Sequence, residues 1–103
     1  MLALDEKTRQ GLGEFCRRRQ VRELSLFGSM IRGEAGPESD VDVLLDFAPE
    51  ARPTLLDLAA MQQELADIFG RPVDLLTRRG MESSPNRLRR EAILFSAQVV
   101  HAA

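Results

Sequence analysis

The segment from residue 40 to residue 77 constrains the fold more than any other part of the chain. Residues 40–47 read Asp-Val-Asp-Val-Leu-Leu-Asp-Phe, which is typical of a strand. Residues 54–69 place apolar side chains at helical spacing, and residues 72–77 are again strand-like. Two strands joined through one helix run parallel, because the helix carries the chain back to the edge where the first strand began. The sequence therefore predicts an α/β domain.

Local signals mark both ends of the helix at 54–69. Thr54 and Asp57 form a capping-box pattern at its start. Gly70 provides a stop, and Pro72 lies just beyond it. These signals predict a helix bounded by a proline-containing loop on one side and a strand on the other.

The N-terminal part predicts another helix and another strand. Residues 5–19 have a helical pattern, with Asp5 suited to cap its start. One face of this helix is apolar, at Leu12, Phe15 and Cys16. Residues 21–27 predict a strand, and residues 30–34 predict a short helical turn. This helix and strand are expected to pack with the segment at 40–77.

The C-terminal part predicts one more helix and a short final strand. Ser84 and Pro85 open the helix, with proline in the first turn, where its missing N–H costs little. The inward face of this helix is expected to carry Leu88, Ala92 and Phe95. Val99 and Val100 continue as the strand. The whole chain, residues 1–103, is expected to form one α/β domain with a small mixed sheet of three or four strands and flanking helices.

Composition excludes several classes of protein. A net charge of −2 argues against bulk nucleic-acid binding, which usually requires a basic excess. The chain contains one cysteine, Cys16, which excludes an intramolecular disulfide. It also contains one histidine, and these two residues alone make a zinc site unfavourable. No apolar run approaches the roughly 18–20 residues that span a bilayer. We therefore expect a cytoplasmic protein without direct membrane or nucleic-acid partners.

Three aspartates on two predicted strands point to metal-dependent chemistry. Asp40 and Asp42 alternate with valine, so both face one side of their strand. Asp74 lies in the middle of the otherwise apolar strand at 72–77 and joins them if the strands are neighbours. Three such carboxylates can hold two Mg²⁺ ions about 3.5–4 Å apart, an arrangement used for phosphoryl or nucleotidyl transfer. Asp46 shares their face but lies too far along the strand to share a metal ion.

A second pattern predicts an anion site near the aspartates. Gly28 and Ser29 end the strand at 21–27, where glycine allows close backbone approach and serine offers a hydroxyl and an N–H. Arg32 follows one turn later, in reach of a triphosphate. The spacing Gly-Ser-x10-Asp-x-Asp from Gly28 to Asp42 arises by chance in on the order of one chain in a thousand of this length.

These residues resemble a known family. Leu26-Phe27-Gly28-Ser29, Arg32-Gly33-Glu34, Ser39 to Leu44 and Pro72-Val73-Asp74-Leu75 are similar to motifs of the minimal nucleotidyltransferases of the DNA polymerase β-like superfamily, over about residues 20–95. The resemblance implies a polymerase β-like nucleotidyltransferase fold. It also implies that Gly28, Ser29 and Arg32 bind the nucleoside triphosphate. Asp40, Asp42 and Asp74 would be catalytic and bind two Mg²⁺ ions, with Asp74 helping to activate the acceptor hydroxyl.

The resemblance also implies a partner and a biological role. Members of this family are typically antitoxins paired with a HEPN-domain toxin, and characterised members transfer AMP from ATP to a tyrosine of that toxin. We therefore expect an adenylyltransferase that acts as an antitoxin. Two alternatives stay open: an antitoxin that neutralises its toxin by binding alone, and an enzyme that transfers a nucleotide to a small molecule such as an aminoglycoside.

Overall fold

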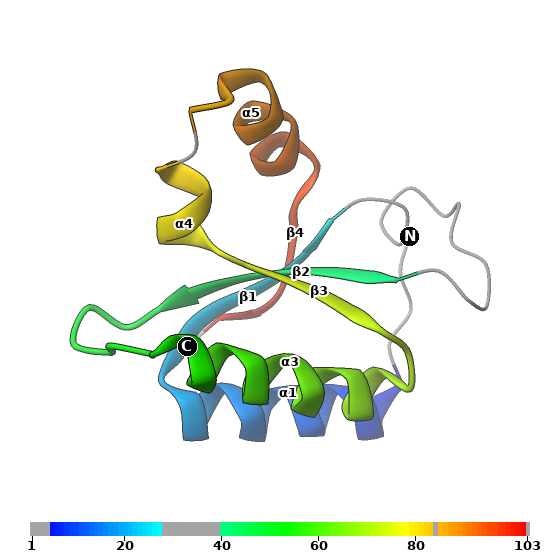
Figure 1. The fold of residues 1–103 in the computed structure, drawn as a ribbon. Coiled ribbons are helices and arrows are strands. Elements are labelled where there is room, and N and C mark those ends of the chain that lie inside the picture. The colour runs from blue at the N-terminus through cyan, green and yellow to red at the C-terminus, as the bar shows by residue number, and fades with distance from the viewer. Residues whose placement is uncertain (1–4, 28–39, 84, 103) are drawn as a thin grey trace.

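A single mixed sheet organises the chain (Figure 1). The computed structural model describes residues 5–27, 40–83 and 85–102. Its elements are, in order, α1 (Glu6–Arg19), β1 (Val21–Phe27), β2 (Val41–Phe47), α3 (Leu55–Phe69), β3 (Val73–Thr77), α4 (Arg78–Glu82), α5 (Arg87–Ser96) and β4 (Gln98–Ala102). The strands lie in the order β3-β2-β1-β4. β2 and β3 run parallel, and β1 is antiparallel to both β2 and β4. The predicted α/β class, the parallel pair and the final strand are confirmed, whereas the turn expected at 30–34 lies outside the described residues.

Helices cover both faces of the sheet, with unequal cores. Figure 1 shows α1 and α3 side by side against one face, and α4 and α5 on the other. The larger core cluster lies between the sheet and the α1–α3 pair; it comprises Leu12, Phe15, Cys16, Val21, Leu24, Leu26, Val41, Val43, Leu45, Met61, Leu65 and Val73. The smaller cluster lies on the opposite face and comprises Phe27, Leu44, Met81 and Ile93. Burial raises the pKa of the Cys16 thiol to about 11, so this cysteine is a core residue, as its place on the apolar face of the first helix predicts.

The helix ends form as their local signals predict. The Thr54 hydroxyl accepts a hydrogen bond from the Asp57 N–H at 3.1 Å, and the Asp57 carboxylate accepts one from the Thr54 N–H at 2.8 Å. Hydrogen bonds from the backbone and the side chain of Thr54 to the Asp57 carboxylate hold the pKa of this carboxyl below its ordinary value. Gly70 ends α3 with φ of 68°, a conformation that glycine adopts at little cost. Asp5 caps α1 by accepting from the Thr8 N–H at 2.7 Å.

One carboxylate joins the two helices of the larger core. Glu64 of α3 accepts hydrogen bonds from Arg18 at 2.7 Å and from Arg19 at 2.6 Å, both near the end of α1. Burial raises the pKa of the Glu64 carboxyl, but the hydrogen bonds and charges of the two arginines outweigh burial and hold that pKa below its ordinary value of 4.5. The three side chains therefore fasten α1 to α3 at one end of the pair.

The C-terminal helices differ from the prediction. α5 begins at Arg87, because the Asn86 carbonyl accepts the first helical hydrogen bond, from Arg90; Pro85 therefore precedes the helix instead of occupying its first turn. Leu88 is 80% exposed, so its expected inward position is wrong. Ile93 is the α5 residue that enters the core, and Leu88 lies about 140° around the helix from it. The side chains of Ala92 and Phe95 lie outside the described set.

A short helix follows β3 where the sequence pattern predicted none. The Thr77 hydroxyl accepts a hydrogen bond from the Gly80 N–H at 3.0 Å and caps α4. Five residues are too few to show a helical repeat, so α4 leaves no periodic signal in the sequence. Within the described ranges, no helix is long and apolar enough to cross a bilayer.

Candidate active site

The sheet brings Asp42 and Asp74 to directly opposed positions. Asp42 of β2 and Asp74 of β3 are register partners, and paired strands lie about 4.8 Å apart. Leu44 and Leu76, two residues further along the same strands, both belong to the smaller core cluster or pack against it. Because side chains alternate along a strand, both aspartates face the side of the sheet that carries α4 and α5. The predicted meeting of these two strands is therefore present in the fold.

Asp40 lies immediately before β2, two residues from Asp42. Its side chain is exposed, as is that of Asp74, whereas Asp42 is half-buried. We call this end of β2 and β3, with Asp40, Asp42 and Asp74, the acidic end. Among residues 5–27, 40–83 and 85–102, no three side chains of the types His, Cys, Asp and Glu gather closely enough to hold a metal ion. The backbone thus places the predicted ligands at one end of the sheet, and their joint coordination of a metal stays a prediction.

The chain leaves β1 beside the same aspartate. Phe27, the last residue of β1, is the register partner of Asp42, so Phe27, Asp42 and Asp74 form a row across three strands. Phe27 is 8% exposed and belongs to the smaller core cluster. The predicted nucleotide-binding residues Gly28, Ser29 and Arg32 lie outside the described residues, so their role stays a prediction.

The donor chemistry of the acidic end suits a divalent cation. Carboxylate oxygens are the hard ligands that Mg²⁺ prefers, and two of them stand at opposed register positions on one face. Like charges at opposed positions destabilise a sheet, and a bound cation removes that cost. The buried apolar residues of the smaller core cluster lie on the same face and hold the strands beneath the carboxylates. The oxygen donors therefore have the chemistry that Mg²⁺ prefers, although the three carboxylates do not converge on one point within the described residues.

Asp46, on the same face of β2, has a different role. Its carboxylate lies 2.7 Å from the Arg22 guanidinium of β1. The hydrogen bond and the charge of Asp46 raise the pKa of Arg22. This ion pair lies at the end of β2 away from Asp40 and Asp42. Asp46 is therefore engaged with Arg22, in line with the expectation that it lies too far away to share a metal ion with those two residues.

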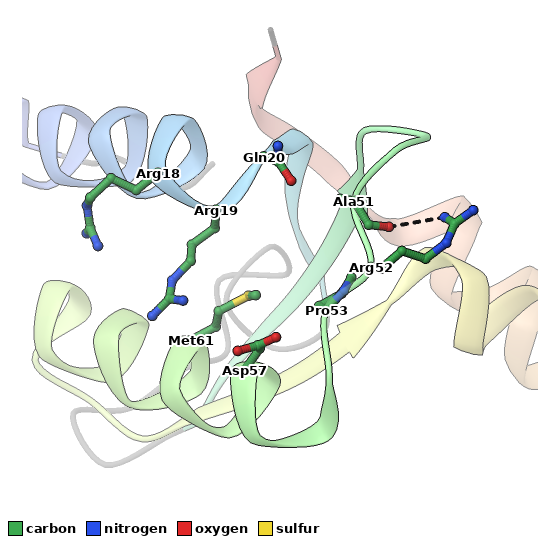
Figure 2. A pocket seen from close by; sticks show the side chains of 8 residues that line it. All are labelled: Arg18, Arg19, Gln20, Ala51, Arg52, Pro53, Asp57 and Met61. Carbon is green, nitrogen blue, oxygen red and sulfur yellow. Dashed lines mark hydrogen bonds between the residues drawn. The ribbon is translucent and has the colours of Figure 1, made fainter.

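A pocket at that other end was missed by sequence reasoning. It has a volume of about 190 Å³ and is lined by Arg18, Arg19, Gln20, Ala51, Arg52, Pro53, Asp57 and Met61. Figure 2 shows Arg19 reaching between α1 and α3, while Arg52 extends to the far side of its loop. Arg52 donates to the backbone carbonyls of Pro49, at 3.0 Å, and Ala51, at 3.3 Å. Three separate segments of the chain build this pocket, so no single stretch of the sequence predicts it.

Comparisons with known proteins agree on one family. The family model described as "Nucleotidyltransferase domain" matches residues 8–100. Protein adenylyltransferase MntA of Thermococcus cleftensis is 43% identical over 63 residues, which cover 61% of this chain and 62% of that protein. The match therefore spans a little under two thirds of this relative's length.

Solved structures share the fold. A structure described as a minimal nucleotidyltransferase aligns with a TM-score of 0.66 and 33% identity, over 87% of this chain and 86% of that one. The MNT antitoxin in complex with a tri-AMPylated HEPN toxin of Shewanella oneidensis aligns with a TM-score of 0.64 and 17% identity, over 93% of this chain and 71% of that one. The second likeness is one of fold alone.

Proposed function

The chain belongs to the nucleotidyltransferase domain family, and from this premise we propose that it transfers AMP from ATP to a hydroxyl of a partner protein. The observation that carries the proposal is the register pairing of Asp42 with Asp74 on one face of the sheet. Support comes from the relative in Thermococcus cleftensis, which is named a protein adenylyltransferase. The proposed unit is a single domain over residues 1–103.

In the proposed mechanism, the three aspartates bind the metal ions and so orient the reacting groups. Asp40, Asp42 and Asp74 would hold two Mg²⁺ ions, and Gly28, Ser29 and Arg32 would hold the triphosphate. Magnesium held there would supply positive charge that neutralises the phosphates and stabilises the attacking and leaving oxygens. Asp74 receives the proton of the acceptor hydroxyl. The acceptor oxygen forms a bond to the α-phosphorus, the bond from that phosphorus to the pyrophosphate oxygen breaks, and pyrophosphate leaves. Most of the rate enhancement comes from positioning and charge neutralisation.

The proposed acceptor is a tyrosine of a HEPN-domain toxin, and the proposed role is that of an antitoxin. The structural neighbour from Shewanella oneidensis is an antitoxin bound to an AMPylated HEPN toxin. The present chain shares the fold of that antitoxin over most of its length. A toxin modified in this way would be silenced by the covalently attached nucleotide.

One observation favours a second candidate, an antitoxin that acts by binding alone. In the described part of the chain, the carboxylates of the acidic end do not converge into a three-ligand group. A binding protein has no need of that convergence. The two candidates differ in whether charge at Asp42 matters for neutralisation.

Labelled ATP separates these candidates. The purified chain, Mg²⁺ and the product of the neighbouring gene are mixed with ATP labelled at either the α- or the γ-phosphate. We expect label on the partner from the α position only, and its loss in Asp42→Asn. Asp46→Asn is the matched control, because Asp46 lies on the same strand and face but pairs with Arg22. Label from the γ position would indicate a kinase, and a stable complex without label would favour binding alone.

A further inference from the structure

The end of the sheet opposite the acidic end is hollowed in three places. Beside the pocket of Figure 2, a second pocket of about 60 Å³ shares Ala51 and Pro53 with it. A third pocket of about 300 Å³ shares Gln20 with the first. All three border the loop between β2 and α3 or the turn between α1 and β1, so they lie at the same end of the sheet.

Cations dominate this region, although the chain as a whole carries a net charge of −2. Six arginines and three carboxylates line the three pockets; they are Arg17, Arg18, Arg19, Arg22, Arg52 and Arg79, with Asp46, Glu50 and Asp57. Arg18 and Arg19 share a single carboxylate, Glu64, which leaves one positive charge in excess. In the described ranges, Arg52 pairs with backbone carbonyls and with no carboxylate. The region therefore offers positive charge to whatever approaches it.

Two leucines stand beside the same pocket and face solvent. Leu55 is 84% exposed and Leu56 is 83% exposed, the highest values among the large hydrophobic residues whose exposure the structure describes. They form the start of α3, between Pro53 and Asp57, which both line the first pocket. The capping box of Thr54 and Asp57 holds this turn in place, so the two side chains are presented on a rigid helix end. Exposed apolar side chains bordered by charge are typical of protein-binding surfaces.

We propose that the part of this region around the first pocket and the start of α3 is a docking surface for a protein partner that presents apolar side chains flanked by carboxylates. We call it the arginine end and define it by Arg18, Arg19, Arg52, Leu55 and Leu56. The inference rests on the proposed function in one respect: the partner is the protein that accepts the nucleotide. The arginine end binds it, and the acidic end carries out the chemistry.

The chemistry of the arginine end favours an acidic protein over other ligands. Leucine side chains give no stacking surface for bases, so nucleic acid would leave Leu55 and Leu56 in water. Two leucines on one helical turn, with the carboxylate of Asp57 beside them, are too small a surface for membrane insertion. Within the described ranges, a second copy of the chain would have to present Leu88, which has the paired Arg87 and Glu91 beside it, or Val99, which is only 49% exposed. A carboxylate-bearing apolar surface complements both the charge and the leucines.

The distance between the two ends sets the size of the partner. β2 has seven residues and runs from one end to the other, which corresponds to about 20 Å. A partner of ordinary domain size spans that length, so one region of it can rest on the arginine end while its acceptor hydroxyl reaches the acidic end. Binding and catalysis are then separable by mutation.

The test measures binding of the neighbouring gene's product to purified variants by calorimetry, with no nucleotide present. Leu55→Asp/Leu56→Asp is expected to raise Kd at least tenfold, and Arg52→Glu several-fold. Acidic residues suit the first turn of a helix, so the double variant is expected to fold, which circular dichroism checks. Leu88→Asp is the matched control, because Leu88 is 80% exposed and also lies in the first turn of a helix. It is expected to leave Kd within twofold of wild type.

The outcomes separate this inference from the proposed function. Binding that depends on Leu55 and Leu56 without transfer of label would support the docking surface and contradict the enzymatic proposal. Transfer of label with an unchanged Kd for the double variant would overturn the docking surface and leave the enzyme intact. An equal loss with Leu88→Asp, or no complex with the wild-type chain, would also overturn it. A wild-type chain that binds single-stranded RNA or phosphatidylserine vesicles through these leucines, but not the partner, would overturn it too.

Discussion

Both ends of β2 carry an aspartate, but one aspartate faces a like charge and the other faces an opposite charge. At the acidic end, the register sets Asp42 against Asp74, and opposed like charges destabilise a sheet. At the other end, Asp46 lies 2.7 Å from Arg22, which stabilises the pair of strands. The carboxylate of Asp46 is thus explained by the fold. For Asp42 and Asp74 we propose a bound cation as the compensating charge, so the aspartates of the acidic end are the better guide to the proposed function.

The largest expected effect is the loss of AMP transfer when the acidic end alone is mutated. Asp42→Asn keeps the size of the side chain and removes its charge, so the chain is expected to fold and to lose AMP transfer by on the order of a thousandfold, equivalent to about 4 kcal/mol of barrier. Initial rates of label transfer measure the loss. Asp46→Asn is expected to stay within about threefold of wild type, since Asp46 pairs with Arg22. Equal losses in the two variants would mean that the two ends do not differ as proposed.

The next effect is a loss of stability when the larger core cluster, which supports the sheet, is mutated. Leu65 of α3 is fully buried in the larger core cluster, and Leu65→Ala is expected to lower the free energy of unfolding by about 3 kcal/mol. Leu88→Ala, at an exposed position, is expected to change it by less than about 0.5 kcal/mol. Urea denaturation measures both values. A small effect at Leu65 would show that the α1–α3 face contributes less than its burial indicates.

The sequence predicted what local signals encode. Thr54 with Asp57 marked the start of α3 and Gly70 its end, because each signal acts through hydrogen bonds or dihedral angles within a few residues. The pairing of Asp42 with Asp74 was also accessible, since a strand–helix–strand unit places its strands in parallel.

What escaped prediction depends on packing between distant segments. Leu88 fits a helical pattern, but the neighbours of α5 select Ile93 for the core. The first pocket joins Arg19, Arg52 and Met61, which lie far apart in the chain. No periodic pattern in the sequence reports such a meeting, so the arginine end became visible only in the fold. The roles of Gly28, Ser29 and Arg32, which lie outside the described residues, stay predictions that rest on their spacing and on the family resemblance.

A smaller effect on the free energy of unfolding is expected at the glycine that precedes β3 near the acidic end. Gly70 turns the chain from α3 toward β3 with φ of 68°, where an L side chain is strained. Gly70→Ala is expected to lower the free energy of unfolding by about 1 kcal/mol. Gly13→Ala, inside α1, is expected to raise it by about 0.5 kcal/mol, because the added Cβ would meet only the His101 ring at 3.8 Å. Thermal denaturation of both variants checks the opposite signs, and equal signs would contradict this account of Gly70.

The last effect, of similar size, tests through its pH dependence the pairing of Glu64 with Arg18 and Arg19 near the arginine end. The pKa of Glu64 is lowered in the folded chain, so the carboxylate contributes stability above its unfolded pKa of about 4.5 and loses it as pH falls through the folded value. Glu64→Gln is expected to cost about 1 kcal/mol at pH 7, since Arg18 and Arg19 lose their shared carboxylate. The difference from wild type is expected to shrink as the pH is lowered below 4.5. Urea denaturation of both proteins between pH 3 and pH 7 measures it, and a constant difference would show that the charge of Glu64 is not what fastens α1 to α3.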